Sequence, residues 1–252
     1  MLAKWFCLLV ITISVCDAKQ IAKDSYFETF FIAPNNMFDE KSPKFRSAIA
    51  IDDYKWPDGI IPFSFEKTYS EKDKTKVFKA MEIISEPTCI EFLETNEDEL
   101  LVHQIKFVKS RIGCRTTVGY HSYHNKSQIV ALTNACISKP TAIQHELLHV
   151  IGLFHEQCRY DRDDFIDIHW ENIEEKQKQN FIKISEKYLT TFNLPYDFKS
   201  LMHYPRHAFS KDKKSYTMTA KNDTTIELGQ IDLIKGGPTY LDLEKVRRMY
   251  NC

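Results

Sequence analysis

The segment HELLHVIGLFHE, residues 145–156, constrains this chain most strongly because it brings three imidazoles and a carboxylate into one short run. On an α-helix, His145 and His149 are about 40° apart around the axis and about 6 Å apart along it, so both can bind one metal ion. Glu146 is turned about 100° from His145, which places its carboxylate beside the metal rather than on it. There it can accept a proton from a water molecule that zinc activates.

The third histidine requires this helix to end. On a continuous helix His155 would lie about 9 Å beyond His149 and about 240° around the axis, which excludes a shared metal ion. Gly152 has no Cβ and can adopt positive φ, so it can end the helix and return His155 as third ligand. An ordinary amphipathic helix with two histidines is the alternative, and the correctly spaced Gly152 and His155 disfavour it. The spacing predicts one zinc ion per chain and a zinc peptidase.

HExxHxxGxxH is the metzincin signature, and the run that follows it, residues 156–163, resembles the astacin family. SLMHY at 200–204 is similar to the astacin Met-turn. The resemblance implies that Met202 lies below the zinc site and that Tyr204 is a further zinc ligand that moves to the developing oxyanion. It covers residues 47–252 as one catalytic domain, and no appended module is expected after Cys252.

The resemblance also implies an α+β fold of two lobes, with the zinc at the floor of the cleft between them and substrate extended along an edge strand. Hydrophobic content of 43% suits the core of one such domain. The upper lobe is expected to have a mixed sheet, the lower lobe to be rich in loops. Periodicity predicts strands at 61–65, 105–108 and 128–132, a helix after Ser70, and helices at 170–187 and 241–250. The strand 128–132 is the candidate edge strand.

The amino terminus has the pattern of a secretory signal peptide, with one basic residue at Lys4, an apolar stretch at 5–15 and short residues at Cys16 and Ala18. The stretch is too short to span a bilayer. We therefore expect residues 1–18 to be removed and the protein to be secreted, extracellular and without stable membrane association. A buried amino-terminal helix is the alternative. A formal net charge of −1 gives no indication of a nucleic-acid partner.

Residues 19–46 are predicted to form a propeptide that keeps the enzyme a latent zymogen; a linker that stays attached is the alternative. Arg46 suits a trypsin-like activating protease. The resemblance implies that the mature chain starts at Ser47 and that its new amino group reaches Glu156, a carboxylate that needs a partner if buried. It also implies a proregion aspartate on the zinc. Asp39 is the candidate, although the family glycine is missing beside it and Glu40 is chemically equivalent.

Cysteine usage agrees with secretion. The chain has seven cysteines, and Cys7 and Cys16 lie in the signal peptide, which leaves an odd number for an oxidising compartment: Cys89, Cys114, Cys136, Cys158 and Cys252. Counting does not choose the pairs. The resemblance implies that Cys89 pairs with Cys252 and Cys114 with Cys136, so that Cys158 is a free thiol or bridges to another chain. A zinc-ligand role for Cys158 is disfavoured because catalytic zinc keeps one position open.

Asn125 and Asn222 begin glycosylation sequons, which also suit a secreted protein. The function favoured is a monomeric zinc endopeptidase that hydrolyses internal bonds of extended protein or peptide substrates. A secreted zinc-binding recognition module without catalysis is the main alternative, and Glu146 argues against it because a structural site has no use for a general base. A disulfide-stabilised domain without metal is a further alternative.

Overall fold

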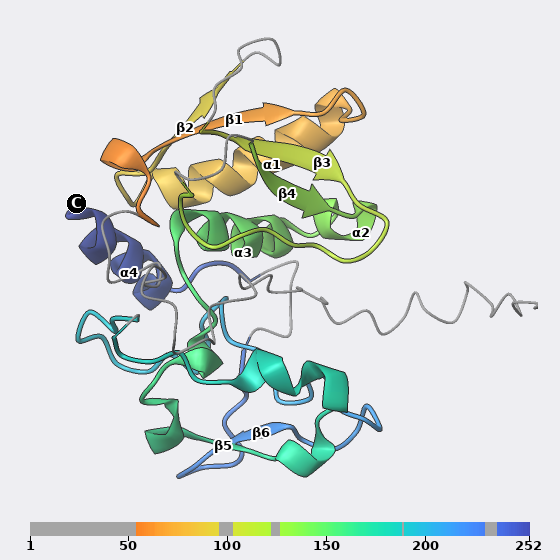
Figure 1. Cartoon of the computed structure of the whole chain (residues 1–252), viewed down its shortest axis with the longest axis vertical. Helices are drawn as coiled ribbons and strands as arrows, with labels where there is room; N and C mark the ends of the chain where they lie inside the picture. The colour runs from red at the N-terminus through yellow and green to blue at the C-terminus, as the bar shows by residue number, and fades with distance from the viewer. Residues whose placement is uncertain (1–53, 96–102, 122–126, 188, 230–235) are drawn as a thin grey trace, which may run out of the picture.

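The structure is a computed structural model that describes residues 54–95, 103–121, 127–187, 189–229 and 236–252. Two lobes lie one above the other (Figure 1). The upper lobe holds a sheet in the order β2-β1-β3-β4, with all strands paired in parallel. Its strands are β1 (Ile60–Phe65), β2 (Glu91–Glu94), β3 (Ile105–Lys109) and β4 (Gln128–Leu132). The mixed pairing expected for this sheet is limited, among the described residues, to an antiparallel bridge that joins Arg115 to Ala131, so the outer side of β4 is partly paired.

Three helices complete the upper lobe. In α1 (Glu71–Ser85) the Ser70 side chain accepts a hydrogen bond from the Asp73 N–H, as the sequence predicted. The short α2 (Asn134–Ile137) precedes α3 (Pro140–Ile151), which starts with its proline in the first turn. The apolar faces of α1 and α3 bury their side chains in one core with the sheet. This core gives α3, which carries HExxH, a rigid position.

The lower lobe consists of short elements around a second apolar cluster. These are η3 (Glu156–Cys158), η4 (Arg162–Asp164), β5 (Ile166–Ile168), η5 (Trp170–Asn172), η6 (Glu175–Phe181) and β6 (Met218–Ala220). β5 and β6 pair antiparallel. The loop-rich lower lobe and the sheet-and-helix upper lobe confirm the α+β fold class.

The continuous helix expected at 170–187 is wrong. Two short 3₁₀ segments, η5 and η6, stand there instead, and the backbone between them is extended at Ile173. Ile173 forms an antiparallel bridge with Ser210, and the Glu174 N–H donates to the Phe209 C=O at 3.0 Å. Pairing with a distant segment therefore replaces the local helical hydrogen bonds, a tertiary effect that local sequence pattern does not contain.

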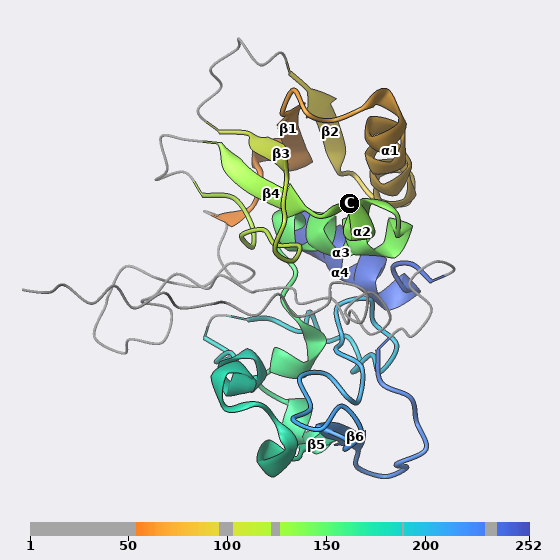
Figure 2. The ribbon, with the colours of Figure 1, turned by 90° about the vertical axis from the view of Figure 1, so that its right-hand side faces the viewer.

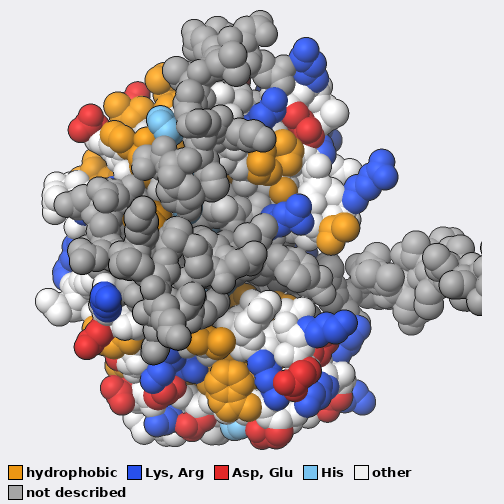
Figure 3. Space-filling view, viewed as in Figure 1, with side chains coloured by type: hydrophobic (Ala, Val, Ile, Leu, Met, Phe, Trp, Pro, Cys, Tyr) orange, Lys and Arg blue, Asp and Glu red, His pale blue; other side chains and the backbone are white. Residues whose placement is uncertain are grey.

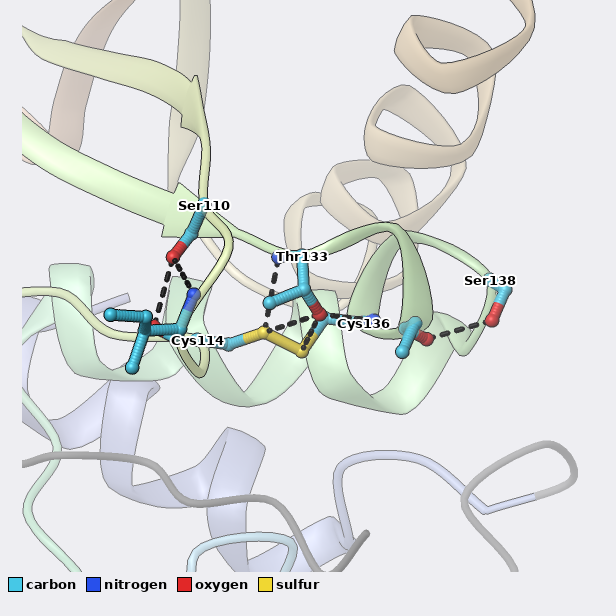
Figure 4. The surroundings of a disulfide bond; sticks show 7 residues. Ser110, Cys114, Thr133, Cys136 and Ser138 are labelled. Atoms are coloured by element: carbon cyan, nitrogen blue, oxygen red, sulfur yellow. Dashed lines mark hydrogen bonds between the residues drawn. A yellow bond between two sulfur atoms is a disulfide. The ribbon is translucent and has the colours of Figure 1, made fainter. Parts of the chain in front are cut away.

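The carboxyl-terminal helix α4 (Tyr240–Tyr250) returns to the upper lobe and lies below α3 (Figures 1 and 2). Cys252 forms a disulfide with Cys89, which lies just before β2. A second disulfide joins Cys114 to Cys136 in α2 (Figure 4). These are the two pairs expected from the resemblance, and Cys158 is a buried free thiol.

On the face in Figure 3, basic and acidic side chains are interspersed over the lower lobe, so no field of one sign forms there. Within the described ranges, no helix has the length and apolar character needed to cross a membrane.

Candidate zinc centre

Three imidazoles converge where α3 meets the lower lobe. The Nε2 atoms of His149 and His155 are 3.2 Å apart, and those of His155 and His145 are 3.3 Å apart. A tetrahedral zinc ion with bonds of about 2.0–2.1 Å requires nitrogens separated by about 3.3 Å. Both separations match this value, and the three donor atoms all lie within 4.8 Å of one another, so the set fits a zinc ion. In the described part of the chain these three histidines are the group of side chains that could hold a metal ion.

Two of these rings are oriented from behind by backbone carbonyls. His145 Nδ1–H donates to the Leu201 C=O at 2.9 Å, and His149 Nδ1–H donates to the Leu153 C=O at 2.7 Å. A proton held on Nδ1 leaves the Nε2 lone pair for the metal. Burial lowers the pKa of His145 to about 4, and it also lowers the pKa of His149 and His155. All three rings are thus held in the neutral form that binds metal.

Gly152 ends the zinc helix as the sequence predicted. Its φ is +130°, and its N–H bonds to the carbonyls of Leu148 and His149. A side chain here would be strained and would meet the Met249 sulfur of α4 at 3.2 Å. The chain then turns into the lower lobe, where the backbone N–H of Glu156 donates to the Met202 C=O at 2.9 Å. This turn carries His155 back to the other two histidines.

Glu146 is the acidic group beside this centre. It is only 1% exposed, and neither carboxylate oxygen has a hydrogen-bond partner among the described residues. Burial raises the pKa of the Glu146 carboxyl to about 8. A buried carboxyl group without a protein partner is costly unless something else occupies its oxygens. A metal-activated water beside the three histidines would satisfy it.

The segment that resembles the Met-turn contacts both parts of the site through its backbone, because the Leu201 C=O accepts from His145 and the Met202 C=O accepts from the Glu156 N–H. The Met202 side chain is buried. Asp242 in the first turn of α4 accepts hydrogen bonds from Ser200 Oγ at 2.5 Å and from the Leu201 N–H at 2.8 Å. The Leu201 carbonyl is the one that orients His145. Sequence reasoning missed Asp242. The TxxD pattern at 239–242 indicates a capping box, but it does not indicate a contact with the Met-turn.

Tyr204 packs beside the third zinc ligand. Its ring centroid is 4.5 Å from that of His155 and 5.9 Å from that of Phe181, and the residue is buried. The structure thus brings the phenol, the three histidines and Glu146 into one region.

Glu156 is buried, and the described residues give it two cationic partners. Lys245 Nζ of α4 lies 2.5 Å from one carboxylate oxygen, and Arg159 Nη1 lies 3.0 Å from the other. The Asp197 N–H also donates to Glu156 at 3.0 Å. Burial alone would raise the pKa of Glu156, but Lys245 and Arg159 hold it below its ordinary value. The sequence predicted the need for a cation, but it did not indicate these two side chains.

The sequence predicted further site residues besides these. Asp39, Arg46, Ser47 and Asn125 are outside the described residues, and Asn222 is exposed. Two observations argue against Cys158 as a zinc ligand. Its thiol donates to the Asn180 C=O at 3.4 Å, and burial raises its pKa to about 12. A thiol that stays protonated is a poor zinc ligand.

Comparison with known proteins agrees with this geometry. The family model for the astacin peptidases matches residues 48–251. The low choriolytic enzyme of Oryzias latipes is 35% identical over 219 residues, which cover 83% of this chain and 75% of that protein. Zinc metalloproteinase nas-4 of Caenorhabditis elegans is 30% identical over 245 residues, 97% of this chain and 74% of that protein. The solved structure of high choriolytic enzyme 1, a hatching enzyme zinc-protease from Oryzias latipes, aligns with a TM-score of 0.69 at 30% identity, covering 79% of this chain and 93% of that one.

A helix bearing HExxH, a third histidine returned by a glycine turn, and a segment similar to the Met-turn that hydrogen-bonds to both define a zinc peptidase of the metzincin type. With the family model matching nearly all of residues 47–252, the chain belongs to the astacin family. It is therefore a zinc metalloendopeptidase that uses one zinc ion and acts on proteins or peptides.

Proposed function

We propose that this protein is a secreted endopeptidase, made as a latent zymogen, in which Glu146 is the general base for hydrolysis of internal peptide bonds. The observation that carries the proposal is the buried Glu146 carboxyl group, which lacks a hydrogen-bond partner among the described residues and directly follows His145 on the helix that carries two of the three convergent imidazoles. When bound, zinc supplies Lewis-acid activation of water and of the scissile carbonyl. Glu146 accepts the proton of the attacking water and delivers it to the leaving amine.

Tyr204 is the proposed donor to the oxyanion. Its ring is tilted by 52° against that of His155 with the centroids 4.5 Å apart, which supports a role for its hydroxyl in the same site. A hydrogen bond that forms as negative charge develops stabilises the transition state more than the substrate. Met202 is buried, and we propose that its side chain supports the zinc site from below through packing.

Substrate is proposed to lie extended along β4. Gln128, Val130 and Leu132 direct their backbone groups toward β3, because Ala131 bonds outward to Arg115 and strand residues alternate. Ile129 therefore directs its N–H and C=O outward, and its side chain is 44% exposed. One peptide strand can add there, while Arg115 limits how far the pairing extends.

Secretion and activation complete the proposal. The signal-peptide pattern of residues 1–18 and the disulfides Cys89–Cys252 and Cys114–Cys136 suit an oxidising compartment. A trypsin-like cut after Arg46 removes the propeptide together with the zinc-directed Asp39. The new Ser47 ammonium then reaches Glu156, directly or through water, in addition to Lys245 and Arg159. The mature enzyme acts as a monomer in the extracellular space.

The decisive experiment is Glu146→Ala in protein cleaved after Arg46, assayed on a peptide library. We expect one zinc per chain to remain and kcat/KM to fall by about 10²- to 10⁴-fold, the usual contribution of a general base. Glu91→Ala, which removes an exposed glutamate of β2, is the control and should cleave normally. If Glu146→Ala keeps more than about a tenth of the wild-type rate, the assigned role is wrong. A wild-type protein that binds zinc and cleaves nothing would favour the recognition module.

A further inference from the structure

The backbone of Tyr204 is held on both sides of its Cα atom. Its N–H donates to Gln157 Oε1 at 3.1 Å, and its C=O accepts from His203 Nδ1–H at 2.6 Å. The first bond fixes the peptide plane before Tyr204 and the second fixes the plane after it. With both planes fixed, φ and ψ are set, and so is the direction of the Cα–Cβ bond. The phenol keeps only its side-chain torsions.

Gln157 reaches Tyr204 from the segment of the third zinc ligand. It is fully buried and stands two residues after His155. Its backbone carbonyl accepts a hydrogen bond from Arg162 Nη1 at 2.7 Å. Its Nε2 has no hydrogen-bond partner in the described part of the chain. The Tyr204 amide is therefore the group that orients this side chain. One glutamine thus links the backbone that carries His155 to the backbone that carries the phenol.

His203 is held in the tautomer that this arrangement requires. To donate to the Tyr204 carbonyl, Nδ1 must carry the proton, so Nε2 is an acceptor. The Tyr196 hydroxyl donates to that Nε2 at 2.8 Å, and the Arg159 guanidinium lies 5.2 Å from the Tyr196 ring centroid. All of these side chains are buried.

Gly229 packs closely against the backbone of His203 and Tyr204. Its φ is +65°, and a Cβ there would lie 2.5 Å from the His203 carbonyl oxygen and 3.0 Å from the Tyr204 carbonyl carbon. Its N–H donates to the Phe198 C=O at 2.8 Å, which keeps this segment against the Met-turn. A side chain at position 229 would therefore push against the backbone of His203 and Tyr204, which pack closely on this glycine.

We propose that Gln157 and His203 are positioning residues that fix the Tyr204 backbone and so direct its hydroxyl at the zinc site. The phenol then moves between metal and substrate by rotation about its own side-chain bonds while its anchor stays fixed. Small displacements of a catalytic group lower the rate strongly, so the anchor matters for turnover. This inference rests on the proposed role of Tyr204.

The test is a double-mutant cycle with Gln157→Met, which keeps the length of the side chain and removes the acceptor, in wild-type and Tyr204→Phe backgrounds. Each zinc-loaded, activated variant is assayed for kcat, for KM and for the rate of zinc transfer to a chromophoric chelator. We expect Gln157→Met to lower kcat by about 5- to 10-fold with KM nearly unchanged and to speed zinc release. In the Tyr204→Phe background, Gln157→Met should change neither kcat nor the rate of zinc release by more than about twofold.

A matched control separates positioning from loss of any buried amide. Gln104 is a buried upper-lobe glutamine that accepts from Thr95 Oγ1 at 2.6 Å, and Gln104→Met should change kcat and zinc release equally little in both backgrounds. Tyr196→Phe removes only the hydroxyl that donates to His203. It should lower kcat as Gln157→Met does, by a smaller factor, and it replaces Gln157→Met in the test if that variant fails to fold.

Three outcomes would overturn the inference. Equal losses from Gln157→Met in both backgrounds would mean that Gln157 supports the zinc site as a whole. No loss from Gln157→Met and Tyr196→Phe, with a clear loss from Tyr204→Phe, would leave the role of Tyr204 intact and remove the anchors. Full kcat in Tyr204→Phe itself would refute the proposed function of Tyr204, and the inference with it.

Discussion

The two lobes hold their parts of the zinc site in different ways. The upper lobe presents His145, His149 and Glu146 from one regular helix whose apolar face is buried against the sheet. The lower lobe presents His155 and Tyr204 from irregular segments held by buried hydrogen bonds and ion pairs. Apolar packing tolerates small changes, whereas a buried charge that loses its partner is strongly destabilising. The lower lobe should therefore depend more on individual polar side chains.

Loss of a zinc ligand should have the largest effect and should not distinguish the lobes. His149→Ala in α3 and His155→Ala in the lower lobe each remove one of three protein ligands, so zinc content should fall well below one per chain and cleavage should be lost. Elemental analysis after dialysis measures the metal. A variant with full zinc content would show that the replaced histidine is not a ligand.

Breaking a buried ion pair of the lower lobe should cost more stability than breaking a partly exposed pair of the upper lobe. Lys245→Met removes a cation from Glu156, which is 3% exposed, and should lower the free energy of unfolding by about 3–5 kcal/mol. The matched upper-lobe change is Lys109→Met, which breaks a pair with Asp73 in which both side chains are 22% exposed. It should cost about 1 kcal/mol or less because water screens such pairs.

Denaturant unfolding of both variants makes this measurement. Equal losses of stability for Lys245→Met and Lys109→Met would refute the contrast between the lobes. Lys245→Met should also release zinc faster than Lys109→Met, because Glu156 directly follows the third ligand.

Extending the new amino terminus should have the smallest effect on stability and activity. A mature chain with two extra residues before Ser47 should stay active and melt at a somewhat lower temperature, because Glu156 already has Lys245 and Arg159 as partners. Thermal unfolding and cleavage rates of the two forms give the comparison. If the extended form matched the native form in both, insertion of the terminus would have no energetic role. Arg46→Ala should prevent the cut that makes Ser47 the amino terminus, and amino-terminal sequencing after trypsin treatment checks this.

The zinc helix and its turn could be predicted because their geometry is local. Residues four apart on a helix share a face, and a glycine can adopt the positive φ that ends it. The start of α1 at Ser70 and the strand 128–132 were likewise predictable from capping and alternation. The helix expected at 170–187 was wrong because Ile173 pairs with Ser210, a partner that no local pattern reveals.

By itself, the sequence determined the metal, the class of chemistry and the two ligands on one helix, because these depend on residue types at fixed short spacings. Only the tertiary structure decided what holds the other half of the site. Asp242 meets Leu201 across 41 residues, Gln157 meets Tyr204 across 47, and Lys245 meets Glu156 across 89. A buried polar group needs a partner, and the sequence shows that need. Which distant side chain supplies the partner depends on how the chain packs, since hydrogen bonds and ion pairs form between neighbours in space.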